Sequence, residues 1–397
     1  MSVFDKKSRL LITCAKELPV FVKQELSGLG FPVLSETVAS VETKGALADA
    51  MILNLKLRTG GHVLYEMAGF PASDPSALYQ GIKKIKWEDV IDPHEYLCVD
   101  SSVQNPNVRD DRFVNQKVKD AVVDRLVIKL GRRPDSGPER RGVVLYIYWV
   151  DDFCRVYIDT SGESLQKRGY RKIPFMAPLQ ETLAAAIIMA GKWDRTGNFI
   201  NPMCGSGTIA IEAALYALNR APGLLRSNFG FMHLKGFPEE LWRDLRAKTR
   251  VESARTFPGK IVATDIDRKA VAASRKNAKT AGVDHLIDFG LCDFRETLLP
   301  AGGGVIVMNP EYGERMGDKA RLEETYKGIG DFFKQKGGGY TGYVFTGNPD
   351  LAKKVGLKTS RKMKFFNSNI ECRLLEYELY EGSKKFKAQN TGASDRT

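Results

Sequence analysis

The feature that most constrains this fold is a series of short apolar segments, separated by helical patterns, that begins after residue 169. The clearest segments lie at residues 198–202, 260–265, 304–309 and 340–346. A strand with one solvated face alternates apolar and polar residues, whereas a strand buried on both faces is apolar throughout. Such strands with helices between them form a parallel sheet covered on both sides. The second half of the chain is therefore expected to be an α/β domain.

The first part of the chain has a different order of elements. Residues 9–14, 38–42 and 62–70 have strand patterns, and residues 18–28 and 45–55 between them have helical spacing. This βαβαβ order predicts a small α+β domain of the ferredoxin-like type.

A second unit is expected after a turn-rich break at residues 71–76. It combines helical patterns at 76–84 and 115–130 with a hairpin formed by 143–150 and 154–160. We place domain boundaries after residues 66 and 168, and we expect residues 383–397, which lack apolar spacing, to form a flexible basic tail.

Composition excludes several classes of protein. A hydrophobic content of 43% in 397 residues is typical of two or three folded domains and argues against global disorder. The longest apolar run, residues 143–150, is too short to span a membrane, and no signal-peptide segment is evident. None of the six cysteines forms a C-x-x-C pair, and the four histidines lack ligand spacing. We expect no metal, no disulfide framework and a cytoplasmic location.

The net charge of +12 points to a polyanionic partner, most simply nucleic acid. Residues 1–168 contain 24 Lys and Arg against 23 Asp and Glu, a net of +1, so the remaining +11 lies after residue 168. Long-range attraction to nucleic acid is thus expected from the second half of the chain.

A glycine-containing turn follows the first apolar strand of this half. Gly205 and Gly207 stand between that strand and a helix, where a ligand can approach the backbone and the free N–H groups of the helix. The next strand ends at Asp265, which is placed to accept ribose hydroxyls, while Asp267 is placed to cap the following helix. Asp293 and Phe294 follow a third strand and could bracket an adenine ring. Asp293 capping the next turn is the alternative.

The most informative motif is Asn309-Pro-Glu-Tyr312, which follows an apolar strand. The exocyclic amine of a nucleobase is a poor nucleophile because its lone pair is delocalised into the ring. The Asn309 side-chain carbonyl and the Pro310 backbone carbonyl could accept its two N–H bonds, while Tyr312 stacks on the base. This arrangement suits amino-group methylation and requires no covalent intermediate.

Residues 169–381 resemble the class I S-adenosylmethionine-dependent methyltransferases with an [Asn/Asp/Ser]-Pro-Pro-[Tyr/Phe] motif. Segments 177–186, 201–214 and 309–315 resemble, more narrowly, the bacterial ribosomal RNA guanine-N2 methyltransferases. Members of that family carry a ferredoxin-like segment and a THUMP domain, an RNA-binding module, before the catalytic domain. The resemblance implies a ferredoxin-like domain at 1–66, a THUMP domain at 67–168 and a Rossmann-like methyltransferase domain at 169–382.

The resemblance also implies which residues contact S-adenosylmethionine. These are Asn201, Cys204, Gly205, Gly207, Asp265 and Asp293, with Pro178, Gln180 and Thr182 closing over the methionine end. Two positions depart from the family pattern: Asn201 stands where many relatives have Asp, and Glu311 replaces the second proline of the motif.

Candidate RNA contacts are basic residues near the expected domain junctions: Lys83, Lys84, Lys167, Arg168 and Arg171. Glu311 is a candidate for base selection, because a carboxylate could accept both N1–H and N2–H of guanine and would repel N1 of adenine. A solvent-facing or capping glutamate is the alternative.

The sequence therefore predicts a methyltransferase that modifies guanine N2 in the 23S ribosomal RNA of the large subunit. One alternative is an adenine-N6 methyltransferase acting on DNA or RNA. A second is a non-catalytic RNA-binding ribosome-assembly factor. The sequence leaves open whether the chain is a monomer or a homodimer.

Overall fold

The computed structural model describes residues 3–106, 108, 110–173, 179–312 and 319–380, which form two units. The first unit consists of residues 1–168 together with 221–252, and the second consists of 169–220 together with 253–397. The segment 221–252 thus lies within the expected catalytic domain in sequence but clusters with the first unit in space. The domain boundary expected after residue 66 falls inside a strand, β4 (His62–Pro71).

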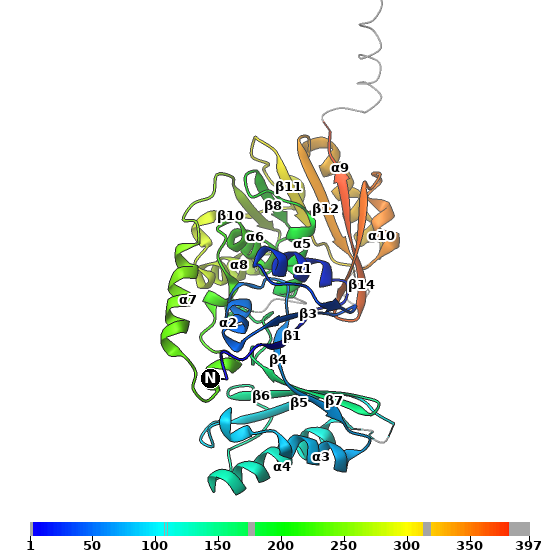
Figure 1. Cartoon of the computed structure of the whole chain (residues 1–397). Coiled ribbons are helices and arrows are strands. Elements are labelled where there is room, and N and C mark those ends of the chain that lie inside the picture. Colours follow the sequence, from blue (N-terminus) through cyan, green and yellow to red (C-terminus); the bar gives the residue numbers. More distant parts are fainter. Residues whose placement is uncertain (1–2, 107, 109, 174–178, 313–318, 381–397) are drawn as a thin grey trace, which may run out of the picture. The chain divides into compact units, whose positions relative to one another are not determined.

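The first unit contains one mixed sheet in the order β2-β3-β1-β4-β7-β6-β5. All neighbours are antiparallel except β5 and β6. Helices α3 and α4 pack together beside strands β5, β6 and β7 (Figure 1). The strands and helices are β1 (Ser8–Thr13), α1 (Pro19–Gly28), β2 (Ser35–Glu36), β3 (Ser40–Gly45), α2 (Leu47–Lys56), β4, α3 (Pro75–Lys84), β5 (Leu97–Gln104), α4 (Asp111–Leu130), β6 (Val143–Val150), β7 (Phe153–Asp159) and, from the inserted segment, α7 (Glu239–Val251).

The second unit contains a sheet in the order β10-β9-β8-β11-β12-β14-β13. The first five strands are parallel, and β14 runs antiparallel to both β12 and β13. The α/β fold predicted from the apolar strands is confirmed. Its elements are α5 (Glu181–Ala190), β8 (Asn198–Pro202), α6 (Thr208–Ala217), β9 (Ile261–Asp265), α8 (Arg268–Ala281), β10 (Ile287–Leu291), β11 (Gly304–Met308), α9 (Lys319–Lys336), β12 (Tyr340–Thr346), α10 (Pro349–Lys354), β13 (Arg361–Asn367) and β14 (Ile370–Glu378).

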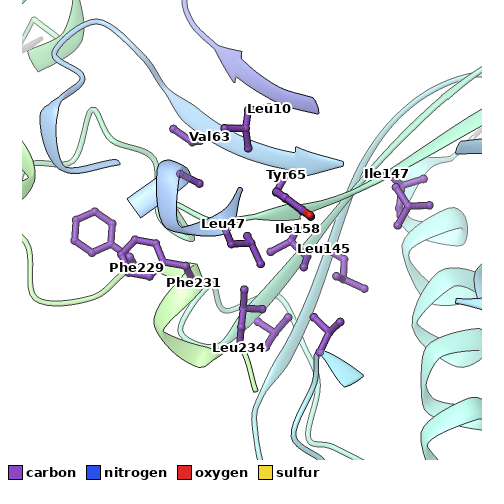
Figure 2. Packing of buried hydrophobic residues seen from close by; sticks show 14 of the residues in the cluster. Leu10, Leu47, Val63, Tyr65, Leu145, Ile147, Ile158, Phe229, Phe231 and Leu234 are labelled. Atoms are coloured by element: carbon purple, nitrogen blue, oxygen red, sulfur yellow. The ribbon is translucent and has the colours of Figure 1, made fainter. Parts of the chain in front are cut away.

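The inserted segment 221–252 contributes aromatic residues to the core of the first unit. Phe229 and Phe231 stack with ring centroids 5.2 Å apart, and Trp242 of α7 lies edge-on to both rings. Figure 2 shows Phe229, Phe231 and Leu234 beside core residues such as Leu47 and Ile158. Burial of large aromatic side chains is a major source of packing energy.

A buried guanidinium holds this segment to the loop that follows β7. Arg226 donates hydrogen bonds to the backbone carbonyls of Ser161, Glu163 and Ser164, and it lies over the Phe229 ring. Burial lowers the pKa of Arg226 to about 10, so the guanidinium remains charged at neutral pH.

Among the described residues, none of the helices combines the length and the apolar character needed to cross a membrane.

We predict that Phe231→Ala destabilises the first unit, although residue 231 lies between α6 and β9 in sequence. The fully buried ring leaves a cavity on truncation, and the free energy of unfolding should fall by about 3–5 kcal/mol. Urea unfolding combined with hydrogen exchange of β1, β4 and β7 measures the change. Val251→Ala on α7, where the side chain is 85% exposed, should change stability by no more than about 0.5 kcal/mol. If Phe231→Ala reduced hydrogen-exchange protection only in the second unit, the assignment of residues 221–252 to the first unit would be contradicted.

Candidate active site

The candidate site lies where the parallel strands of the second unit end. Strand β9, the next strand in the chain, pairs with one edge of β8, and β11 pairs with the other edge. The strand order therefore reverses at β8. Ligands of open α/β sheets bind at the carboxyl ends of strands around such a reversal. The pairing of β8 with β11 stops at Ile200 and Ile306. Asn201 and Asn309, which follow on these two strands, each have a buried side-chain oxygen without a hydrogen-bond partner among the described residues.

Asn201 bridges the two strands just past the last pair. Its Nδ2 donates to the Val307 carbonyl at 2.8 Å, and its buried Oδ1 has no hydrogen-bond partner among the described residues. A buried acceptor without a partner is costly, so this oxygen is suited to receive a donor from a ligand. An aspartate, which the family pattern favours here, could not donate to Val307 without being protonated.

The glycine turn after β8 is shaped both for close packing and for access. Gly205 and Gly207 have φ values of 54° and 83°, a region in which side chains are strained. A Cβ on Gly207 would lie 2.1 Å from Ser274 Oγ of α8, whereas a Cβ on Gly205 would meet nothing within 4 Å. Gly207 therefore allows the turn to contact α8, and Gly205 leaves its outer side open.

Asn277 of α8 holds this turn and was not identified from the sequence. Its Nδ2 donates to the carbonyls of Ser206 and Ile173, and its Oδ1 accepts from the backbone N–H groups of Lys172 and Ile173. The side chain is fully buried. A polar residue on the buried face of an otherwise alanine-rich helix was the available signal.

Asp265 lies at the end of β9 and is hydrogen-bonded to the glycine turn. Its Oδ2 accepts from the Gly205 N–H and its Oδ1 from the Asp267 N–H, both at 2.9 Å. Asp267 caps α8 through the Lys269 N–H, as predicted. Ile266, an apolar side chain beside Asp265, is 73% exposed and was not identified from the sequence. An exposed apolar group next to the carboxylate predicted to bind ribose is suited to contact a base.

Asp293 and Phe294 do not form the expected bracket. Asp293 caps the short helical turn 294–296 through the Arg295 N–H and pairs with the Arg295 side chain at 3.1 Å. The Phe294 ring is buried against Phe332 of α9 in the core of the second unit. The capping alternative describes Asp293, and the Phe294 ring is part of the core.

The motif after β11 carries a further unpartnered oxygen. Asn309 Oδ1 is buried and has no hydrogen-bond partner among the described residues. Pro310 is buried beside it. Glu311 is exposed and forms an ion pair with Arg321 of α9 at 2.7 Å, so its carboxylate is engaged on the solvent side.

Tyr312 is partly buried, and its hydroxyl accepts a hydrogen bond from Asn367 Nδ2 at 2.9 Å. Burial raises the pKa of Tyr312 to about 12. Burial likewise raises the pKa of the Cys204 thiol to about 12. The phenol and the thiol are therefore neutral near pH 7, and Cys204 lacks the thiolate form that a nucleophile needs.

Arg171, expected to contact RNA, instead braces the segment beside the glycine turn. Its guanidinium donates to the Leu179 carbonyl and Thr208 Oγ1 and pairs with the buried Glu181. Gln180 occupies the N-cap position of α5, and Thr182 is buried in its first turn. Pro178 lies outside the described residues.

The remaining candidate RNA contacts belong to the first unit. Arg168 is 1% exposed and donates to the backbone carbonyls of Leu165 and Arg58, so its predicted contact with RNA is wrong. Lys167 is exposed and pairs with Glu163, Lys83 lies against Tyr79, and Lys84 is exposed at the end of α3. These three lysines remain candidates.

We predict that Asn201→Asp destabilises the protein more at pH 8 than at pH 5. An ionised carboxylate would face the Val307 carbonyl as a second acceptor, at a cost of about 1–3 kcal/mol. Burial would raise the folded-state pKa of this carboxyl. The protonated form can still donate to Val307, so the variant should lose stability as the pH rises and the carboxyl ionises. Urea unfolding of both proteins at the two pH values measures the difference. An equal deficit at both pH values would show that the Asn201 amide does not donate to Val307.

Comparison with known proteins gives matches along most of the chain. Residues 168–376 match the RMKL-like methyltransferase domain, residues 9–64 the RlmL ferredoxin-like domain and residues 72–159 the THUMP domain. The ribosomal RNA large subunit methyltransferase K/L of Syntrophotalea carbinolica is 36% identical over 95% of this chain and 54% of its own length. A Synechocystis protein named as an RNA methyltransferase is 34% identical over 93% of this chain and 96% of its own length. The chain spans about half the length of most of the listed curated relatives.

Solved structures resemble the whole described fold. SMU.472, crystallised as a complex with SAH, has a TM-score of 0.85 and 28% identity over 95% of this chain and all of that chain. A Listeria monocytogenes protein described as a predicted N6-adenine-specific DNA methylase has a TM-score of 0.84 and 30% identity over 95% of this chain and 97% of its own. The family model covers more than half of the chain, and the resemblance noted from the sequence motifs is confirmed. The chain belongs to the family of proteins with the RMKL-like methyltransferase domain.

Proposed function

We propose that this protein transfers a methyl group from S-adenosylmethionine to N2 of guanine in large-subunit ribosomal RNA. The observation that carries the proposal is the buried, unpartnered Oδ1 of Asn309 at the end of β11. A buried acceptor without a partner is expected to be satisfied by a donor on a ligand, and the exocyclic amine of a base is such a donor.

Several residues fit the cofactor. Gly205 leaves open space at the turn, Asp265 is placed for the ribose hydroxyls, and Asn201 Oδ1 is free to accept from the amino group of the methionine end. The complex of SMU.472 with SAH supports the same choice. When bound, S-adenosylmethionine supplies an electrophilic methyl group.

The chain's own residues would activate and orient the amine. Asn309 Oδ1 and the Pro310 carbonyl accept its two N–H bonds, which draws the nitrogen lone pair out of the ring and towards tetrahedral geometry. Tyr312 stacks on the base and holds it in line for transfer. A guanine within an RNA helix would have to be flipped out of its stack to reach these groups.

The choice of RNA rests on the match to a THUMP domain and on relatives named as ribosomal RNA methyltransferases. The charge distribution is compatible with it, because the second half of the chain carries most of the net positive charge. The neighbour described as an adenine-specific DNA methylase keeps adenine-N6 methylation as the second candidate, since the same two acceptors would serve either amine.

We predict that Asn309→Ala lowers the rate of methyl transfer to ribosomal RNA by about a hundredfold or more without weakening S-adenosylmethionine binding. Asp265→Ala should show the opposite pattern and lose cofactor affinity. Calorimetry with S-adenosylmethionine and nucleoside analysis of methylated RNA separate the two effects. Wild-type turnover by Asn309→Ala would contradict the proposed role. Failure of the wild-type protein to bind the cofactor would favour a non-catalytic RNA-binding factor.

Glu311 is proposed to favour guanine by accepting N1–H, a donor that adenine lacks, while the two N2–H bonds go to Asn309 and Pro310. Arg321, its ion-pair partner, would hold the carboxylate close to the motif. We predict that Glu311→Gln lowers methyl transfer to native RNA about tenfold or more, because the charged acceptor is replaced by an amide that also presents a donor. Glu324→Gln, at an exposed position on the same helix as Arg321, is the matched control. Unchanged turnover together with unchanged guanine preference in Glu311→Gln would contradict a role of Glu311 in base selection.

A further inference from the structure

The hydroxyl of Tyr312 is held by a part of the chain that the mechanism above does not use. Asn367 is the last residue of β13, and its Nδ2 donates to the Tyr312 hydroxyl at 2.9 Å. Cys372 Sγ of β14 lies 3.7 Å from the same oxygen. Both residues belong to the hairpin formed by β13 and β14, whose strands pair up to Asn367 and Ile370. The contact therefore joins the motif after β11 to the far edge of the sheet.

The ring of Tyr312 is fitted to its neighbours as well. A Cβ on Gly347 would lie 2.9 Å from two atoms of the Tyr312 ring, so the ring edge lies directly against the glycine backbone. The Phe345 ring is edge-on to Tyr312 at 6.5 Å between centroids. These contacts restrict rotation of the ring, and the hydrogen bond from Asn367 fixes the position of the hydroxyl and therefore the direction of the long axis of the ring.

An asparagine at the end of a hairpin commonly bonds to the backbone of its own turn. Here the amide is directed to a side chain 55 residues away in sequence. Such a long-range bond to a partly buried hydroxyl serves geometry, since the Tyr312 hydroxyl stays neutral across the working range of pH.

We propose that Asn367 is a positioning residue for the target base, because it fixes the tilt of the Tyr312 ring axis and thereby the ring on which the base stacks. This inference rests on the proposed function, in which Tyr312 provides that stacking surface. Loss of the amide would leave the ring in place on Gly347 but free to change its tilt, and misplacement of a reacting group by about 1 Å can cost a hundredfold in rate.

A double-mutant cycle on methyl transfer to ribosomal RNA tests the proposal. Asn367→Ala and Tyr312→Phe should each lower kcat about tenfold, with no change in S-adenosylmethionine affinity. The double variant should be no slower than either single variant, because both remove the same hydrogen bond. Asn369→Ala, at the exposed tip of the same hairpin, should be as active as wild type. Losses that multiply to about a hundredfold, or a fully active Asn367→Ala, would overturn the proposal.

A measurement that does not depend on activity keeps the two proposals apart. In protein labelled with 13C at the tyrosine Cζ, the Tyr312 resonance, assigned by its absence in Tyr312→Phe, should shift in Asn367→Ala and stay unchanged in Asn369→Ala. An unmoved resonance in Asn367→Ala overturns the positioning role. A shifted resonance in a protein that methylates no ribosomal RNA overturns the proposed function and supports Asn367 as the residue that holds Tyr312.

Discussion

The arrangement of the site depends on the point at which β8 and β11 stop pairing. Beyond Ile200 and Ile306 the backbone ladder ends, and the Asn201 amide makes the next link, to Val307. One strand continues into the glycine turn and the other into Asn309. A single side chain therefore ties together the segment suited to the cofactor and the segment suited to the target amine. Asn201 and Asn309, beyond the end of this ladder, each carry a buried oxygen without a hydrogen-bond partner among the described residues.

Residues that are distant in sequence support the site from both sides. On one side α8 supplies Ser274 and Asn277 to the glycine turn, and Arg171 connects the start of α5 with the start of α6. On the other side the β13–β14 hairpin holds Tyr312. The motif residues lie on turns rather than inside strands, and such turns need outside contacts if their side chains are to keep one geometry.

The sequence was sufficient to predict the elements whose signal is local. Apolar strands with helices between them identify a parallel sheet, and Asp267 before a helical pattern identifies a cap. The sequence was insufficient where a residue's role depends on distant partners. Arg168 and Arg171 look like surface charges, yet their hydrogen-bond acceptors lie at residues such as Arg58 and Thr208. The position of Phe294 directly after a strand is typical of a ligand-binding aromatic residue, but its ring packs against Phe332 of a later helix, in the core. The core role of residues 221–252 likewise depends on a sheet formed far earlier in the chain.

We propose that the Asn309 site methylates guanine N2 in large-subunit ribosomal RNA. Mass spectrometry of nucleosides from the ribosomal RNA of cells with and without this protein tests it most directly. N2-methylguanosine in the large-subunit RNA should decrease when the protein is absent and return when it is restored. An unchanged level of N2-methylguanosine, or a loss of N6-methyladenosine in its place, would contradict the account.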